Sequence, residues 1–335
     1  MKTPLVSVII VNWNGGKVFS DCLNSLSKIS YKNYELIIVD NGSTDGSDNV
    51  GKKYRVNKFI KNKSNVGFAE ANNQGIKVSR GKYLLLLNND TLVTKDFLNI
   101  MILKMEEDKS VGVMQPKIFM IDKPGHLDNA GSFLTWSGFL FHNGYGEKDS
   151  KEFDKERKVH TAKGACMLIR AEVVEKLGLF DPDFVSYFEE SDFCSRVWLA
   201  GFSVLYYPKA RIYHKVGFTS KKLDQFSVNY HSLKNRIVSY LKNFGSLGLI
   251  IIFIPHIAIL FFLILIYLIK LDFGKVGMVL KAFWWNLLNL GKTIAKRKRI
   301  QKLRRVSDSQ IFKDTLVGWK ISDMIKHFFI VEKNF

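Results

Sequence analysis

The sequence predicts an α/β fold with a mostly parallel central sheet, followed by a C-terminal helical segment that associates with a membrane. Residues 5 to about 115 alternate short apolar, β-branched runs with stretches of helical spacing, a pattern typical of parallel strands joined by helices. Polar residues follow each apolar run. Leu247 to Ile269 contains no Asp, Glu, Lys or Arg and is long enough to cross a bilayer.

The elements of the α/β part follow from these patterns. The predicted strands are Val6–Val11, Leu36–Val39 and Tyr83–Leu87, and the predicted helices are Lys17–Ile29 and Phe68–Val78. Residues 116–160 are rich in Gly and predict a loop-rich region. Ordered structure is expected again at Gly164–Gly178, Phe180–Gly201, Ser203–Tyr207 and Ile212–His214.

The C-terminal part predicts membrane attachment. A second apolar stretch, Val276–Leu290, is interrupted by Lys281, and residues 271–335 carry 14 Lys and Arg against 5 Asp and Glu. Because positive segments favour the cytoplasmic side, a helical hairpin or re-entrant helix is preferred to a single span. The expected divisions are an α/β domain at 1–225, a linker helix at 226–243, a membrane-embedded hairpin, or a span plus interfacial helix, at 244–290, and a basic cytoplasmic tail at 291–335.

Composition restricts the partners and the compartment. The formal net charge of +19 attracts anions such as acidic lipid head groups or phosphorylated substrates. The basic tail lacks interleaved aromatics, so we expect it to lie along anionic membrane lipid and not on nucleic acid. Three widely spaced cysteines and the lack of a signal-peptide pattern favour the cytoplasmic face of the plasma membrane.

Polar residues at strand ends are the first functional signal, because open parallel sheets bind ligands at the carboxyl ends of their strands. Asn12 and Asn14 follow the first strand, and the run Asp40–Gly46 follows the second. A carboxylate at Asp40 can accept hydrogen bonds from a nucleotide base or ribose. A capped turn without a ligand is the alternative interpretation.

Two further motifs suit a phosphorylated ligand. The amide-rich stretch Asn65–Gly75 opens a helix whose N-terminus can face a phosphate. Asn88, Asn89 and Asp90 end a strand of four leucines, and a single carboxylate with phosphate oxygens and water is sufficient for Mg²⁺ or Mn²⁺. A strand-end turn remains the alternative for Asp90.

Acidic residues cluster at the start of a later predicted helix. Glu189, Glu190 and Asp192 lie within four residues, so mutual repulsion predicts a raised pKa for one of them and a role as general base. Asp192 and Arg196 have the i,i+4 spacing of a helical ion pair. His214 ends a short apolar run, where an imidazole serves either as a metal ligand or structurally.

The order of these motifs resembles that of the inverting nucleotide-sugar glycosyltransferases with a GT-A fold, in the rhamnosyltransferase-like branch of family 2. The residues that carry the resemblance are Val6–Asn14, the Asp40 loop, Asn65–Gly75, Asn88–Asp90, Gly164–Arg170, Glu189–Arg196 and His214, and they cover about residues 4 to 240. The chain departs from the family pattern in having Glu189–Glu190 where relatives often have Glu-Asp, and Asn88 where relatives often have Asp.

The resemblance implies roles for these residues. Asp40 binds the donor base, Asp90 binds a divalent cation, Mg²⁺ or Mn²⁺, with His214 nearby, and Glu190 acts as the base, with Glu189 and Asp192 as further catalytic candidates. The candidate donor-binding residues are Asn12, Asn14, Asp40, Asn41, Asn65, Gly67, Asn73, Asn89, Gly164 and Ala165. The expected donor is a nucleoside-diphosphate sugar, with deoxythymidine-diphosphate rhamnose first, and the expected acceptor is a polyprenyl-linked or other glycan. An inactive nucleotide-sugar sensor and a processive polysaccharide synthase are the alternatives.

Overall fold

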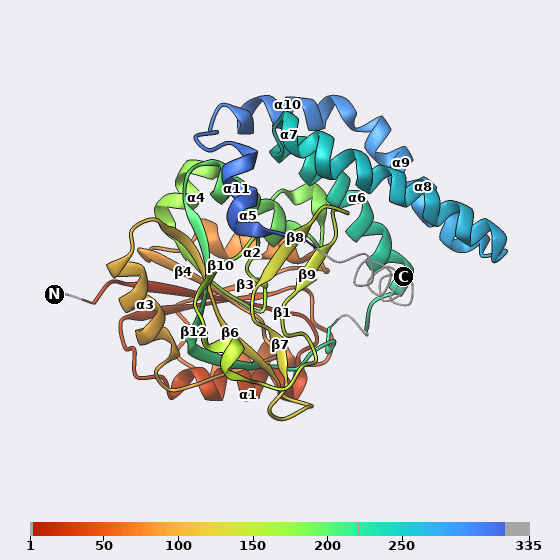
Figure 1. Ribbon diagram of the computed structural model, residues 1–335. Coiled ribbons are helices and arrows are strands. Elements are labelled where there is room, and N and C mark those ends of the chain that lie inside the picture. The colour runs from red at the N-terminus through yellow and green to blue at the C-terminus, as the bar shows by residue number, and fades with distance from the viewer. Residues whose placement is uncertain (1–2, 220–221, 319–335) are drawn as a thin grey trace.

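The computed structural model describes residues 3–219 and 222–318, and a ten-stranded sheet lies at the centre of this part of the chain (Figure 1). Its strands are β1 (Val6–Asn12), β2 (Tyr34–Asp40), β3 (Lys58–Lys61), β4 (Tyr83–Leu87), β5 (Thr91–Val93), β6 (Val111–Met120), β7 (Leu127–Asn129), β10 (Arg157–Lys158), β11 (Cys166–Arg170) and β12 (Ser203–His214). The helices around it are α1 (Gly16–Ser27), α2 (Phe68–Lys77), α3 (Phe97–Glu107), α4 (Ala171–Leu177) and α5 (Glu189–Leu199), with 3₁₀ turns η1 (Ser47–Lys53), η2 (Lys151–Asp154) and η3 (Pro182–Phe184).

The sheet confirms the predicted mostly parallel arrangement. Its main order is β10-β12-β6-β11-β4-β1-β2-β3, in which β1 pairs in parallel with both β2 and β4, and β11 is antiparallel to β4 and β6. Alternate residues of β1 enter two different cores, since Ile9 packs on the side of α2, α4 and α5, and Val8 packs on the side of α1 and α3. Burial of both faces explains why these strands are continuous apolar runs.

The region predicted to be loop-rich, 116–160, lies mostly outside regular elements but also contains short strands that were not predicted. Strand β6 continues to Met120, and β7, β10, β8 (Ser132–Thr135) and β9 (Leu140–His142) lie in this region. These strands have only two to four residues apart from β6, which is too short for an alternating pattern to be recognised. The two strand-like runs near residue 210 are likewise one strand, β12, with an irregular register between Tyr207 and Arg211.

The C-terminal helices form a layer beside the sheet domain. Helix α6 (Gln225–Asn243) includes the residues expected as a linker, and it packs against α5, α9 (Phe273–Leu288) and α10 (Leu290–Gln301). Helix α11 (Asp308–Thr315) follows, and strand β13 (Leu316–Val317) pairs with β8 to give a small sheet β13-β8-β9. Part of the basic segment expected to lie along lipid therefore packs on the protein, and its last residues, 319–335, lie outside the described residues.

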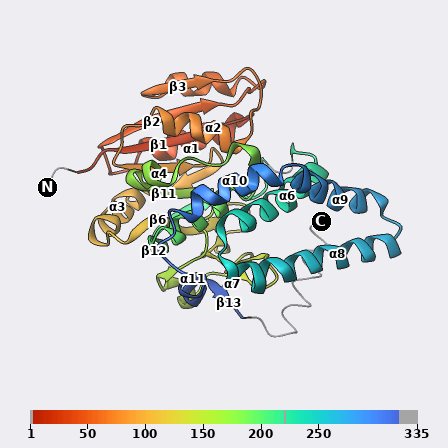
Figure 2. The ribbon, with the colours of Figure 1, turned by 90° about the horizontal axis from the view of Figure 1, so that it is seen from above.

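Helices α8 (Ile254–Ile269) and α9 form a hairpin that projects from the side of the molecule opposite the N-terminus (Figures 1 and 2). The helix that ends in α8 begins with α7 (Ser246–Gly248) and a π-helical turn at Leu249–Phe253, just before Pro255. The described residues contain one helix long and apolar enough to cross a membrane, Ser246–Ile269, with a mean hydropathy of 3.1. Length and composition alone make it a weak membrane candidate.

Candidate active site

Three parallel strands bring polar side chains to one edge of the sheet. Asn12 and Asp40 are direct partners in the register of β1 and β2, and Asn12 Nδ2 donates to Asp40 Oδ1 at 3.1 Å. Asn89 follows β4 and donates to Asn12 Oδ1 at 2.9 Å. A Cβ added to Gly15 would lie 2.4 Å from Asn12 Oδ1 and 2.7 Å from Asn89 Nδ2, so only glycine allows the backbone to pack this closely against the hydrogen-bonded pair.

Two neighbouring loops are tied together by amide side chains. Asn41 Nδ2 donates to Asn65 Oδ1 at 2.9 Å, and Asn41 Oδ1 accepts from the Val66 backbone at 3.0 Å. Asn14 Oδ1 accepts from the Thr44 backbone at 2.8 Å. Gly67 has a φ of 88° and lies against Val185. The donor-binding candidates of these loops therefore lie together at the same edge as Asp40.

A chain of charged groups runs along the adjoining edge. His214 Nε2 lies 3.2 Å from Asp90 Oδ1, and His214 Nδ1 lies 2.8 Å from Asp128 Oδ2. Asp128 also pairs with Lys163 Nζ at 2.6 Å. Burial by itself lowers the pKa of His214, but hydrogen bonds and charges of Asp128 and Asp90 raise that pKa to about 9. The predicted proximity of Asp90 and His214 is thus a feature of the structure.

The Asp90 carboxylate fits a divalent cation bound jointly with a phosphorylated ligand, and His214 can join it once the imidazole releases the proton that its raised pKa retains. Asp90 Oδ1 is buried and has no hydrogen-bond partner of good geometry among the described residues. Within residues 3–219 and 222–318, no group of three or more His, Cys, Asp and Glu side chains is arranged to hold a metal alone. Mg²⁺ and similar cations need only one or two protein ligands when substrate phosphates and water complete the coordination.

Glu189 and Glu190 begin helix α5 with their carboxyl groups buried. Oε2 of each lacks a hydrogen-bond partner in the described part of the chain. Burial raises the pKa of both, and in Glu189 the neighbouring Glu190 adds to the effect. In Glu190 the backbone of Gly164 and the charge of Lys163 oppose the rise in pKa. Glu190 therefore lies beside groups that favour its ionised form, whereas its charge disfavours that of Glu189.

The loop directly before α5 has three residues other than glycine with positive φ. Val185, Tyr187 and Phe188 have φ values of 63°, 68° and 73°, a region that costs energy for side chains larger than glycine. Asn235 of α6 compensates, since its Nδ2 donates to the backbone oxygens of three loop residues at 2.6 to 2.9 Å. Val185 O accepts from the Ala69 backbone at 3.1 Å, which links the loop to the start of α2.

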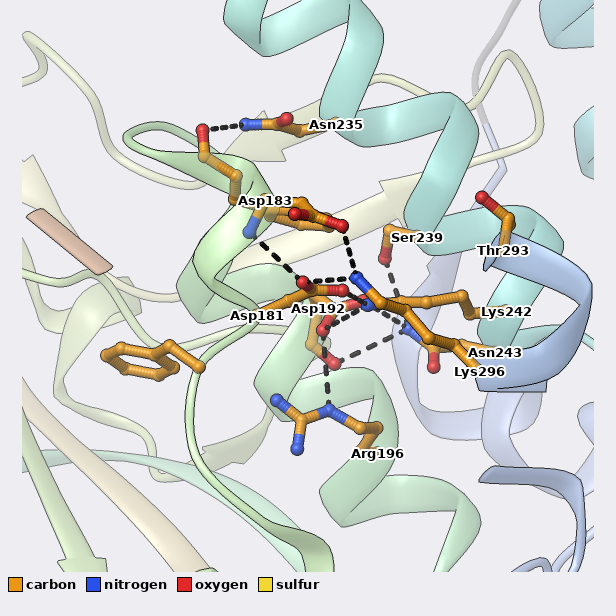
Figure 3. Close-up of polar contacts among 12 residues, drawn as sticks. Asp181, Asp183, Asp192, Arg196, Asn235, Ser239, Lys242, Asn243, Thr293 and Lys296 are labelled. Atoms are coloured by element: carbon orange, nitrogen blue, oxygen red, sulfur yellow. Dashed lines mark hydrogen bonds and ion pairs between the residues drawn. The ribbon is translucent and has the colours of Figure 1, made fainter. Parts of the chain in front are cut away.

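Asp192 lies in a buried ion cluster between α5, α6 and α10 (Figure 3). Its carboxylate contacts Lys242 Nζ at 3.0 Å and accepts from Asn243 Nδ2 at 2.8 Å. The predicted ion pair with Arg196 is present at 3.3 Å. Lys242 also pairs with Asp181 at 2.6 Å, and Lys296 joins that aspartate at the same distance. These contacts fix the helix that carries Glu190.

Three other donor-binding candidates have contacts within the protein. Asn73 makes two hydrogen bonds to the Phe180 backbone, at 2.9 and 3.0 Å, and so joins α2 to the loop before η3. Ala165 O accepts from the Asn88 backbone at 3.0 Å. A Cβ on Gly164 would lie 3.4 Å from Glu190 Oε1. Antiparallel pairing of β4 with β11 thus brings the acidic pair to the edge that carries Asp90.

This fold and edge define the class of GT-A-like glycosyltransferases. The chain belongs to glycosyl transferase family 2, whose pattern matches residues 7–178. It is 25% identical over 271 residues to an uncharacterized glycosyltransferase of Haemophilus influenzae, covering 75% of this chain and 80% of that one. It is also 29% identical over 227 residues to an uncharacterized protein of Sinorhizobium fredii, covering 63% of this chain but only about a quarter of that protein.

A solved structure agrees on the fold. A mannosyltransferase from Pyrobaculum calidifontis, crystallised with GDP-Man and Mn²⁺, has a TM-score of 0.53 with this chain at 15% identity, covering 90% of this chain and 84% of that one. At this identity the likeness shows the fold alone. The chain is therefore a member of glycosyl transferase family 2 with a GT-A-like fold.

Proposed function

We propose that this glycosyltransferase moves a sugar from a nucleoside-diphosphate donor onto a lipid-linked glycan, with inversion, in the synthesis of a cell-surface polysaccharide. The observation that carries the proposal is the Glu190 carboxylate, whose Oε2 is buried without a hydrogen-bond partner among the described residues, at the sheet edge that also carries Asp40 and Asp90. A buried base with a raised pKa suits proton removal from a hydroxyl. The resemblance of the sequence makes rhamnose the first sugar to test.

In the proposed step, Glu190 Oε2 takes the proton of an acceptor hydroxyl as its oxygen attacks the anomeric carbon. The bond from that carbon to the donor phosphate breaks, and its electron pair leaves with the nucleoside diphosphate. A divalent cation held by Asp90 and His214 would neutralise charge on the phosphates. Asp40, Asn12 and Asn89 would bind the nucleoside, and Asp192 would position helix α5.

We also propose attachment to the cytoplasmic face of the plasma membrane through the α8–α9 hairpin. Ile254, Phe261 and Leu265 of α8 are 56 to 60% exposed, and Trp284 and Leu287 of α9 are 60 to 61% exposed. Apolar surface on two adjacent helices marks an interaction site. Exposed cations of α10 lie beside it in sequence, which suits anionic lipid.

The first experiment measures donor consumption by the purified protein in detergent with a panel of nucleotide sugars and Mg²⁺ or Mn²⁺. Glu190→Gln should lower the transfer rate by roughly 10² to 10⁴-fold while donor binding is retained. Glu189→Gln should lower it less, and Asp90→Ala or a chelator should abolish transfer. Glu172→Gln, at a side chain 63% exposed on α4, is the control.

The alternatives give different results. A sensor would bind a nucleotide sugar yet transfer nothing to any lipid extract, and a processive synthase would yield long polymers from a single acceptor. If Glu189→Gln abolished transfer and Glu190→Gln did not, the two carboxylates would exchange roles. Formation of a product with retained anomeric configuration would contradict the single displacement.

A further inference from the structure

Helix α6 carries a buried cation that has no anionic partner among the described residues. Arg236 is 7% exposed, and its Nε and Nη1 atoms have no hydrogen-bond partner within residues 3–219 and 222–318. Burial lowers the pKa of its guanidinium, but an arginine stays charged in proteins. A buried charge without a partner costs several kcal/mol. Such a group requires an explanation beyond packing.

The surroundings of Arg236 join three parts of the molecule. Its guanidinium lies 4.5 Å from the ring centroid of Phe139 and 5.1 Å from that of Phe188. Phe188 directly precedes the acidic pair Glu189–Glu190. Phe139 follows β8 and packs against His256 of α8, with ring centroids 5.1 Å apart. Arg236 therefore lies at the junction of the acidic pair and the apolar hairpin.

The N–H groups of Arg236 that lack hydrogen-bond partners indicate what the side chain can bind. Aromatic faces attract the cation but accept no conventional hydrogen bonds from its N–H groups. The two rings lie against the guanidinium, and its N–H groups in the plane can donate to the oxygens of an anion. Phosphate matches that geometry, and arginine binds it more specifically than lysine does.

We propose that Arg236 binds the phosphate or diphosphate that joins lipid to sugar in an amphiphilic acceptor. The lipid would then lie along the apolar faces of α8 and α9, and the sugar hydroxyl would extend past Phe188 toward Glu190. The inference rests on the proposed function, because it assigns a substrate class to that active site. The donor phosphates belong to the separate edge at Asp90 and His214.

The test compares binding of farnesyl diphosphate and farnesol in detergent, by thermal shift and by titration. Wild type should bind the diphosphate at least tenfold more tightly than the alcohol. Arg236→Gln should remove that difference, and Arg236→Lys should restore part of it. Arg55→Gln, at an exposed arginine that precedes β3, should leave it unchanged. Equal preference for the diphosphate in wild type and Arg236→Gln would overturn the proposal.

A second arm separates the acceptor phosphate from a phospholipid head group. Phosphatidylglycerol added to the micelles should not displace farnesyl diphosphate, and full displacement would assign the site to membrane lipid and overturn the proposal. If Arg236→Gln does not fold, the test uses wild type alone. Binding of farnesol as tightly as farnesyl diphosphate would then overturn the proposal. Nucleotide-sugar binding, measured in parallel, reports on the proposed function independently.

Discussion

At the scale of single residues, Lys242 is a buried ammonium shared by two buried carboxylates. It contacts Asp181 at 2.6 Å and Asp192 at 3.0 Å. Lys242→Met should therefore lower the free energy of unfolding by about 3–5 kcal/mol, because it leaves buried charges unpaired. Urea unfolding measures this. Lys82→Met, at a side chain 51% exposed beside Glu106, should cost under about 1 kcal/mol, and equal costs for both would contradict the cluster's role.

Gly67 gives a second prediction at this scale. A Cβ there would lie 2.5 Å from Val185 O, in the loop directly before the acidic pair. Gly67→Ala should cost at least about 2–3 kcal/mol of stability and weaken donor binding, because both the backbone conformation and the contact forbid a side chain. At Gly46 φ is 78°, and an added Cβ would meet no atom within 4 Å. Gly46→Ala should therefore lower the free energy of unfolding only by the conformational cost of about 1 kcal/mol. Thermal unfolding measures both variants.

At the residue scale, the sequence predicted which side chains lie together where those side chains follow a strand. Asn12, Asp40, Asn89 and Asp90 each follow an apolar run, and the parallel register brings them together. Asp128 was missed because its partner His214 is 86 residues away, and a lone aspartate in a glycine-rich region carries no local signal. Lys163 was missed for the same reason, since only the folded chain brings its charge beside Asp128.

At the scale of elements, the long periodic segments were predicted within a few residues. Helix α1 was expected at Lys17–Ile29 and found at Gly16–Ser27, and α2 was expected at Phe68–Val78 and found at Phe68–Lys77. The short strands at β7 to β10 escaped prediction. Their stability comes from pairing with β6, with β12 and with one another, and such tertiary pairing outweighs local propensity.

The hairpin of α8 and α9 carries the prediction at this scale. Replacing Phe261, Leu265 and Trp284 together by Ser should remove about 3 kcal/mol of membrane affinity, or roughly a hundredfold, because each side chain loses partial burial in lipid. Co-sedimentation with vesicles containing phosphatidylglycerol measures this. Leu103→Ser, at a side chain 71% exposed on α3, is the control. Unchanged vesicle binding by the triple variant would contradict attachment through the hairpin.

At the scale of the whole molecule, the buried His160 should make the free energy of unfolding depend on pH. It is buried beneath α5, near Ser195, and burial lowers its pKa to about 4. The unfolded chain, with a histidine pKa of about 6.5, therefore takes up this proton first as the pH falls. Stability should be lost between about pH 6.5 and pH 4, with up to about 3 kcal/mol due to His160.

Chemical unfolding at pH 7 and pH 4 measures this contribution. Wild type should lose about 3 kcal/mol more than His160→Gln over that interval, while His126→Gln, at a surface turn beside Pro124, should behave like wild type. Equal losses in wild type and His160→Gln would show that this histidine does not cause the acid sensitivity. The charge of the remaining groups is the same in both proteins, so it does not affect the comparison.

The residues that contact α5 from α6 and α10 are synthesised after α5 itself. Asp181 leaves the ribosome 115 residues before its partner Lys296, and Asp192 leaves 50 residues before Lys242. The hydrophobic hairpin emerges between those two lysines. A nascent chain thus reaches its apolar stretch with the supports of its acidic pair still incomplete. Synthesis of the hairpin therefore precedes completion of the ion cluster that supports α5, so a half-made chain lacks the contacts that hold Glu189 and Glu190 in place.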